Sequence, residues 1–380
     1  MNEPSLFHSD VAQARTAGNR RGETTTRRQW LRFGCLATTF ATLHGAVTDD
    51  RVLGQAPATA PSWLPNTPEA VERGLKFLAG QLAADNSFGS SEYDRQVSIT
   101  SLAGMAFLSS GSTPDRGPLR SEMTRCVDYL IAGARPNGLI AEPLCADRLQ
   151  MYGHGFSLLF LSEISGMARH ADLRSVVSAA VRLTCDCQSS QGGWPYTPES
   201  IDSDVSVTAC QLVALRAARN AGHAVDKAVV DRAYRFVRSC QNADGGFRYL
   251  AADGPSDFPR SAAALAAMYA AGDYDSDHVR RAIQYLAAQQ DQFTSLGADS
   301  KGNLPTGQQY FHYGQYYAAQ AWWQSGAEHW GPWFRLLQPT ILRLQQPDGG
   351  WQSEFGRAYA TAMSLIVLQI PNNLLPILQR

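Results

Sequence analysis

Two acidic residues, Asp202 and Asp204, stand directly before an apolar segment that begins at Val205. A pair of carboxylates can carry acid–base chemistry when burial or a neighbouring carboxylate keeps one of them protonated. Asp202 is close enough in sequence to act on Asp204 in this way, whereas the N-terminus of a following helix would favour the ionised form. An aspartate in this position can also cap the helix by accepting backbone N–H groups. The pattern leaves two roles open for Asp204, a general acid and a helix cap.

A second group of candidate residues is aromatic. Tyr310, Tyr313 and Tyr317 are three and four residues apart and therefore share one face of a helix, and Trp322 and Trp323 follow them. Aromatic rings can stabilise a cation through their π faces, line an apolar pocket, or pack in a protein core. All three interpretations stay open at this point.

Metal ligands are scarce in the sequence. His154 and His312 are the histidines placed to meet at one site, and two are too few for the three or four protein ligands of a zinc site. The seven cysteines include no Cys-x-x-Cys pair and are too sparse for a disulfide scaffold. We predict no metal and no cofactor.

The composition bounds the class of protein. With 380 residues, 44% of them hydrophobic and 18% charged, the chain is typical of a soluble globular protein with a large core. A formal net charge of −1 gives no support for a nucleic-acid partner. No segment approaches about 20 consecutive apolar residues, so we expect no transmembrane helix, while peripheral contact with a membrane stays open.

The elements that position these residues follow an internal repeat. Glycine pairs followed by an aromatic residue occur in segments 188–194, 241–247 and 346–351, which begin with glutamine. Weaker copies lie at 87–89 and 136–138, and 296–297 falls where the remaining copy is expected. The copies are roughly 50 residues apart, a period typical of a repeated supersecondary unit.

Each repeat contains two kinds of helical segment. Amphipathic segments precede the glycines at 71–81, 126–134, 177–188, 233–241, 281–290 and 334–346. Segments that are apolar on nearly every face follow at positions such as 97–108, 205–217 and 260–271. A helix that is apolar all round is buried, and an amphipathic one lies at the surface. We therefore predict six helical hairpins that form an inner ring within an outer ring, around a central cavity.

In such a ring the starts of the inner helices converge at one mouth of the cavity. Besides Asp202 and Asp204, we expect the following residues to line it: Tyr152, His154, Ser206, Thr208, Asp257, Arg260, Tyr310, His312, Tyr313, Arg357 and Tyr359.

At these glycine repeats the sequence resembles the squalene cyclases and the β-subunits of protein prenyltransferases. The resemblance covers roughly residues 66 to 371 and implies their all-α fold, an α/α toroid. Segments 151–156 and 356–362 resemble inner-helix starts of exported bacterial proteins with prenyltransferase/squalene oxidase repeats. The repeats are specific for the fold and say little about activity, because one fold can carry several functions.

The resemblance also suggests roles for the two aspartates. Squalene–hopene cyclases protonate an alkene with the middle acid of an Asp-x-Asp-Asp motif, which Asp204 matches. Asp202 matches the first carboxylate, and Val205 replaces the last one. No Asp-x-Cys pair at an inner-helix start matches the zinc site of the protein prenyltransferases. Cyclase chemistry is thus implied in part and protein prenylation is not.

The N-terminal residues differ in kind from the rest. Segment 26–32 contains the pair Arg27–Arg28 and is followed by a mildly apolar run at 33–47, which resembles a twin-arginine export signal. We predict a signal peptide and N-terminal extension over 1–56, a linker over 57–65, a toroid over 66–380, and an exported, periplasmic or extracytoplasmic protein.

Three functions are compatible with these observations. The leading one is a toroid that binds an isoprenoid or similar apolar small molecule, with protonation-initiated cyclisation as its catalytic form. The others are a non-catalytic scaffold or binding protein, and a glycan-active enzyme in which Asp202, Asp204 and Asp257 supply acid and base. The sequence leaves open whether the chain is an enzyme and what its oligomeric state is.

Overall fold

The computed structural model describes residues 63–90, 93–142, 149–199, 201–252, 254–294 and 310–379, all within one unit of the chain, Val52–Arg380. The predicted export signal and the linker up to residue 62 lie outside the described residues, so both stay predictions.

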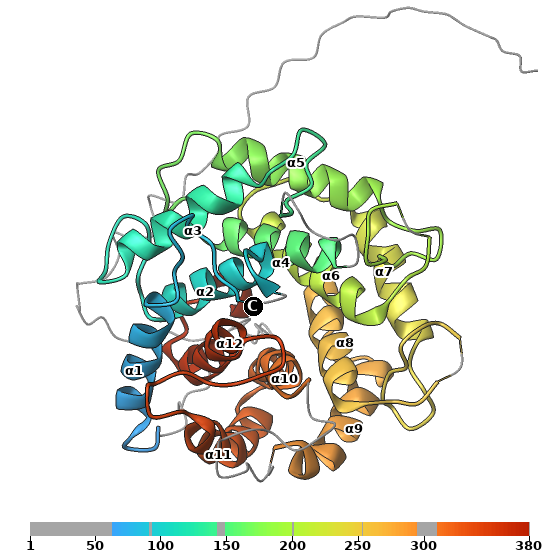
Figure 1. Ribbon diagram of the computed structural model, residues 1–380. Helices are drawn as coiled ribbons and strands as arrows, with labels where there is room; N and C mark the ends of the chain where they lie inside the picture. The colour runs from blue at the N-terminus through green and yellow to red at the C-terminus, as the bar shows by residue number, and fades with distance from the viewer. Residues whose placement is uncertain are drawn as a thin grey trace, which may run out of the picture. The chain divides into compact units, whose positions relative to one another are not determined.

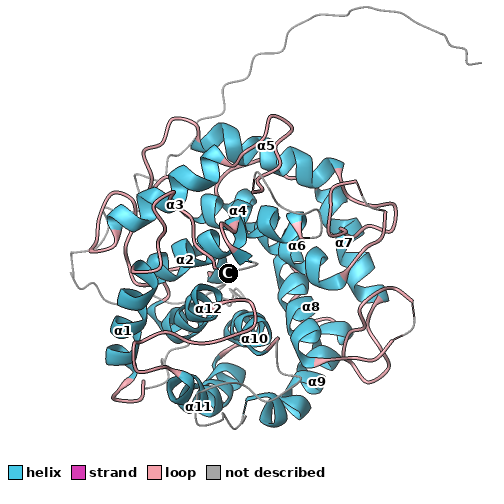
Figure 2. Ribbon diagram, in the orientation of Figure 1, coloured by secondary structure: helices cyan, strands magenta, loops and turns pink. Residues whose placement is uncertain are grey.

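Helices account for nearly all regular structure in the described residues, and Figure 2 shows only helices and loops there. One set comprises α1 (Thr67–Ala79), α3 (Arg120–Ala132), α5 (Leu173–Asp186), α7 (Lys227–Ser239), α9 (Asp277–Thr294) and α11 (Ala327–Leu344). The other set comprises α2 (Val97–Ser109), α4 (Gln150–Glu163), α6 (Val205–Asn220), α8 (Phe258–Ala271), α10 (Phe311–Ser325) and α12 (Arg357–Gln369). The predicted all-α fold is confirmed.

The even-numbered helices form a closed inner ring. Each packs against the next, from α2 through α4, α6, α8 and α10 to α12, and α12 packs against α2. The odd-numbered helices lie outside them, and α1 packs on α12, as Figure 1 shows. The described residues thus form six helical hairpins arranged as an inner and an outer ring, the predicted α/α toroid.

Burial separates the two rings as their sequences predict. Along α8, every residue from Phe258 to Ala270 is buried except Arg260, and its many alanines let the neighbouring helices approach closely. The outer helix α7 buries only Val229, Ala233, Phe236 and Val237, which lie on one face. The apolar core is therefore concentrated between the rings and within the inner ring.

A glutamine at the end of an outer helix ties each of three hairpins to the next one. The Gln188 amide donates to the carbonyl oxygens of Gly192, at 2.7 Å, and Val229 at the start of α7, at 2.8 Å. Its own oxygen accepts from Arg232, at 2.8 Å. The same arrangement recurs where Gln241 meets Gly245, His278 and Arg281, and where Gln345 meets Gly349, Ala70 and Arg73.

The third of these glutamine links closes the ring, because it joins α11 to α1. It also corrects the sequence analysis, which began the last repeat at Gln346. The spacing of four residues between glutamine and the first glycine, seen at 188 and 192, places Gln345 in this role. Gln346 instead donates to the Leu344 carbonyl.

The first glycine of each pair permits a close approach of the next outer helix. Gly349 has φ +95°, and a Cβ on it would lie 2.6 Å from the carbonyl oxygen of Arg73 in α1. Residues with a side chain are disfavoured at positive φ, and no Cβ fits against a carbonyl at that distance. Glycine is thus required where the last hairpin meets the first.

The C-terminal segment covers one end of the inner ring. After α12 the chain forms short 3-10 turns at Ile370–Asn372 and Pro376–Leu378, and the second of these contacts both α6 and α10. The Ile377 amide donates to the buried Glu163 carboxylate at the end of α4, at 2.9 Å. Figure 1 shows the C-terminus at the centre of the ring. The C-terminal ends of the inner helices are therefore covered by the chain itself.

Candidate functional site

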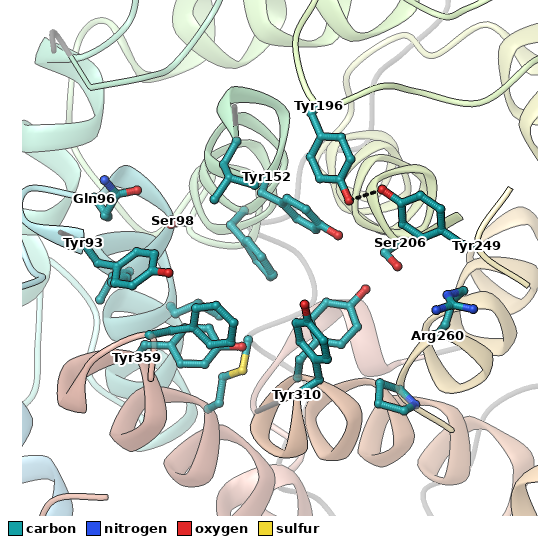
Figure 3. A pocket seen from close by; sticks show the side chains of 18 of the residues that line it. Tyr93, Gln96, Ser98, Tyr152, Tyr196, Ser206, Tyr249, Arg260, Tyr310 and Tyr359 are labelled. Carbon is teal, nitrogen blue, oxygen red and sulfur yellow. Dashed lines mark hydrogen bonds between the residues drawn. The ribbon is translucent and has the colours of Figure 1, made fainter. Parts of the chain in front are cut away.

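A cavity of about 300 Å³ opens at the other end of the ring, among the N-terminal starts of the inner helices. Figure 3 shows side chains from the inner helices and the preceding loops converging on it. Its lining residues are Tyr93, Gln96, Ser98, Ile99, Leu102, Leu149, Tyr152, Phe156, Tyr196, Ser206, Tyr249, Asp257, Pro259, Arg260, Tyr310, Tyr313, Phe355, Tyr359 and Met363. The predicted central cavity is thus present near one mouth.

The lining changes in character with depth. Leu102, Phe156 and Met363 lie more than one turn into α2, α4 and α12 and make an apolar floor. At the level of this floor the ring is filled by aromatic packing, in which Phe156 contacts Tyr316 and Tyr316 contacts Tyr317, with centroids 6.0 and 4.9 Å apart. The cavity is therefore short and does not run through the toroid.

Tyrosines dominate the rim of the cavity. Tyr152, Tyr310, Tyr313 and Tyr359 are expected there from the sequence, and all four line it. Three more tyrosines that the sequence pattern does not predict line it as well: Tyr93, Tyr196 and Tyr249, from the loops before the inner helices. A signal for the last two exists, because both follow the aromatic residue of a glycine repeat by two positions, in Trp194-Pro-Tyr196 and Phe247-Arg-Tyr249.

The tyrosine hydroxyls are uncharged hydrogen-bonding groups at neutral pH. Burial raises the pKa of Tyr249 to about 12, and it raises the pKa of Tyr152 and Tyr313 well above the ordinary value. The hydroxyls are therefore uncharged polar groups at the cavity, and the rings present apolar surface.

Asp257 and Arg260 also line the cavity, and each engages the other. Asp257 caps α8 by accepting from the Arg260 backbone N–H at 2.8 Å, and its second oxygen forms an ion pair with the Arg260 guanidinium. That guanidinium lies over the ring of Tyr249, 5.5 Å from its centroid. Because Asp257 offsets its charge, Arg260 brings little net positive charge to the cavity.

Asp204 lies behind the cavity wall and is 2% exposed. It caps α6, since its Oδ1 accepts from the Val207 backbone N–H at 2.8 Å. Its Oδ2 accepts from the hydroxyl of Tyr196 at 3.0 Å, and that hydroxyl lies 2.5 Å from the hydroxyl of Tyr249. Two tyrosines thus separate this carboxylate from the cavity, and the cap role weighed in the sequence is present.

Asp202 takes no part in this arrangement. It is exposed and does not line the cavity, whereas Asp204 is buried. The pKa of Asp204 is raised chiefly by burial, and hydrogen bonds from the Val207 N–H and the two tyrosines oppose the rise. The expectation that Asp202 works with Asp204 as a carboxylate pair is corrected.

Acidification is expected to stabilise the wild type relative to Asp204→Asn. Because burial raises the pKa of Asp204 above 3.8, the folded state binds this proton more tightly than the unfolded state. The resulting stability is fully present below pH 3.8 and is lost as the pH rises through the folded pKa. Urea unfolding at pH 7 and pH 4 measures this, and an unchanged difference between the two proteins would contradict it.

Thr208, His154 and His312, which the sequence predicts at the cavity, form hydrogen bonds within the fold instead. Trp194 donates its backbone N–H to Thr208 Oγ1 at 3.0 Å, and Ile140 donates likewise to His154 Nδ1 at 3.2 Å. His154 Nε2 pairs with Thr184 at 2.9 Å. His312 lies buried between the Gln352 carbonyl, at 3.1 Å, and Ser364.

Burial lowers the pKa of both histidines to about 4, so they are neutral at pH 7. His154, Thr208 and His312 are absent from the cavity lining and have all their polar side-chain atoms engaged within the fold. Their assignment to the cavity is corrected.

Arg357 is a further correction. Its guanidinium lies 4.4 Å from the ring centroid of Phe77 in α1 and pairs with Asp348 at 2.6 Å. It therefore supports the junction between the last hairpin and the first, outside the cavity. Ser206, by contrast, lines the cavity as expected and is labelled in Figure 3.

The described residues also bear on whether the chain holds a metal-binding group or a helix able to span a membrane. No three His, Cys, Asp or Glu side chains among them come together in a group that could hold a metal ion. None of the helices described has both the length and the apolar character that crossing a membrane requires.

Comparison with known proteins gives one family match. A family model described as the prenyltransferase alpha-alpha toroid domain matches residues 120–321. No curated protein matches the chain in sequence.

Several solved structures share the fold. A variant of type II terpene cyclase MstE from Scytonema, in complex with geranylgeranyl dihydroxybenzoate, is 13% identical with a TM-score of 0.56, covering 82% of this chain and 98% of its own. An inactive variant of the α-1,6-mannanase GH76A from Salegentibacter is 9% identical with a TM-score of 0.57, covering 81% and 99%. A protein from Actinoplanes is 15% identical with a TM-score of 0.54, covering 81% and 99%. At such low identity these likenesses concern the fold alone.

Proposed function

The chain belongs to the prenyltransferase alpha-alpha toroid domain family, and from this premise we propose that its cavity binds one short isoprenoid or a similar amphiphilic molecule. The observation that carries the proposal is the change in lining, from the apolar floor of Leu102, Phe156 and Met363 to a rim of tyrosine hydroxyls. An apolar chain on the floor and a polar head at the rim would satisfy both surfaces.

The size of the cavity limits the ligand. Small-molecule sites range from about 300 to 1,000 Å³, and this cavity is at the lower limit. A short prenyl chain fits that space better than a triterpene. The MstE structure contains a prenyl chain joined to an aromatic head, which is an amphiphile of this general kind, although longer.

Filling the cavity is expected to weaken binding strongly while the fold persists. Ser206 lines the wall at the start of α6, and in Ser206→Trp the indole would occupy space that the ligand needs. We expect the affinity for geraniol, measured by isothermal titration calorimetry, to fall by about 100-fold, roughly 2.7 kcal/mol.

The matched control is Ser175→Trp, because Ser175 is an exposed residue of the outer helix α5. This variant should bind like the wild type. Equal binding by Ser206→Trp and the wild type would show that the ligand binds elsewhere. A folded wild type that binds neither geraniol nor farnesol would contradict the proposal and favour a scaffold role.

Proton-initiated cyclisation of a prenyl substrate is the second candidate function, and one observation favours it. Asp204 has a raised pKa and reaches the cavity wall through the Tyr196 hydroxyl. In such a step Asp204 would give its proton to the Tyr196 oxygen, and the Tyr196 proton would pass to an alkene carbon. The alkene π electrons would form the new C–H bond and leave a carbocation for the next alkene to attack.

Turnover of a prenyl substrate by the wild type and its loss in Asp204→Asn, with binding retained, would support this candidate. Product formation that persists in Asp204→Asn would exclude it. The two tyrosines between Asp204 and the cavity make binding the better supported function.

Glycan hydrolysis has weaker support in the described residues. Glycosidases usually place two carboxylates on either side of the bond to be cut. Among the residues that line the cavity, Asp257 carries the one carboxylate, and it is paired with Arg260. Asp202 is exposed away from the lining and Asp204 lies behind Tyr196, so the predicted three-carboxylate arrangement is not present.

A further inference from the structure

The hydrogen bonds from Asp204 to the cavity wall have a direction. An ionised carboxylate has no proton and can only accept hydrogen bonds. Tyr196 therefore donates its single proton to Asp204 Oδ2, at 3.0 Å. The Tyr196 oxygen is then the acceptor in its 2.5 Å contact with Tyr249, and Tyr249 is the donor.

This direction determines what Tyr249 can offer to a ligand. A tyrosine hydroxyl has one proton and two acceptor lone pairs. Because the proton of Tyr249 points into the wall, toward the Tyr196 oxygen and Asp204, only its oxygen lone pairs face the cavity. Tyr249 lines the cavity and is 39% exposed, so a ligand can reach that oxygen.

The surroundings hold the arrangement in place. The Val205 N–H at the start of α6 donates to the Tyr249 carbonyl at 3.2 Å, which fixes the loop, and the Val207 N–H holds the other oxygen of Asp204. Arg260 lies over the Tyr249 ring and directs its guanidinium N–H groups to Asp257 and the Pro255 carbonyl. The acceptor character of Tyr249 is therefore built into the fold.

We infer that Asp204 is a positioning residue that sets the hydrogen-bond polarity of the cavity wall through Tyr196 and Tyr249. The cavity accordingly selects amphiphiles whose head group donates a hydrogen bond, such as an alcohol or a phenol, over those whose head can only accept one. This inference rests on the proposed function and names the chemistry of the head group.

A single substitution should reverse the polarity. In Asp204→Asn the side-chain oxygen can still accept from the Val207 N–H, and asparagine caps helices as well as aspartate does. The amide N–H group can then donate to the Tyr196 oxygen. Tyr196 would in turn donate to Tyr249, and the Tyr249 proton would be free to point into the cavity.

The experiment compares geraniol with its methyl ether, which has the same chain and no hydroxyl proton. We expect the wild type to bind geraniol about tenfold more tightly than the ether, as measured by isothermal titration calorimetry. In Asp204→Asn that ratio should fall to about one or reverse. The methyl group of the ether affects its binding to both proteins alike. A difference in the geraniol-to-ether ratio between the wild type and the variant therefore reports the hydrogen-bond polarity of the wall.

Two further variants test the connection itself. Tyr249→Phe removes the hydroxyl at the wall and should bring the ratio close to one. Tyr196→Phe leaves Asp204 capping α6, and Tyr249 can still donate to that carboxylate, so the ratio should stay well above one. A merely structural role for Asp204 would weaken both ligands equally and leave the ratio unchanged.

The outcomes separate the two proposals. An equal ratio in the wild type, Asp204→Asn and Tyr249→Phe would overturn the inference and leave the proposed function standing. Absence of binding of either compound to the folded wild type would overturn the proposed function itself.

Discussion

Gly349→Ala is expected to destabilise the protein by about 3 kcal/mol and to loosen the closure of the ring. Two costs combine here. A residue with a side chain in this left-handed conformation costs about 1–2 kcal/mol. Overpacking typically adds about 1–3 kcal/mol, and the new Cβ would lie 2.6 Å from the Arg73 carbonyl oxygen of α1. Urea unfolding monitored by circular dichroism measures the loss.

Gly222→Ala is the matched control for this prediction. Gly222 also has a positive φ, +87°, and nothing lies within 4 Å of the place that its Cβ would take. It should therefore show the conformational cost alone, about 1 kcal/mol. Equal losses at both positions would mean that the contact between the last and first hairpins adds nothing to stability.

Ile377→Asp is the second substitution for which we expect a large effect. Ile377 is 5% exposed, and its backbone N–H is bound to the Glu163 carboxylate. A second carboxylate there would be buried without a positive partner and would be repelled by Glu163. Uncompensated buried charge costs about 3 kcal/mol or more. The C-terminal segment should therefore detach from the ring.

Hydrogen exchange at the Ile377 amide reports this detachment directly, because that N–H group is protected by Glu163 in the folded protein. Leu374→Asp is the control, since Leu374 belongs to the same segment and is 44% exposed. It should exchange and unfold like the wild type. Unchanged protection of the backbone amide at position 377 in Ile377→Asp would contradict the role given to this segment.

The fold was predictable because its signals are local and repeated. The glycine pairs mark where outer helices end, and the contrast between α7 and α8 in apolar residues distinguishes the two rings. Ring closure was less visible, since it depends on Gln345 and Ala70, which are far apart in the sequence. That contact exists only once six hairpins have completed the turn.

The cavity residues were harder to assign, for a geometric reason. Successive residues on a helix are about 100° apart, so positions two apart point to nearly opposite faces. Tyr152 lines the cavity and His154 faces the outer ring, and Ser206 and Thr208 differ in the same way. An inner helix that is apolar on every face gives no indication of which side is the inside.

The roles of the aspartates depended on burial, which the sequence does not record. Asp202 and Asp204 are two residues apart, yet one is exposed and the other is 2% exposed. The partners of Asp204 come from two different loops, through Tyr196 and Tyr249. Their convergence could not be inferred from either loop alone.

Because the C-terminal segment covers the far end of the ring, the cavity formed by the described residues opens between the tyrosines. A molecule bound at that entrance would slow the exit of one bound on the floor. The closed floor also limits the length of the chain that the cavity can bury. A chain that reaches Phe156 and Met363 gains nothing from further carbons, because each one added must remain outside in water.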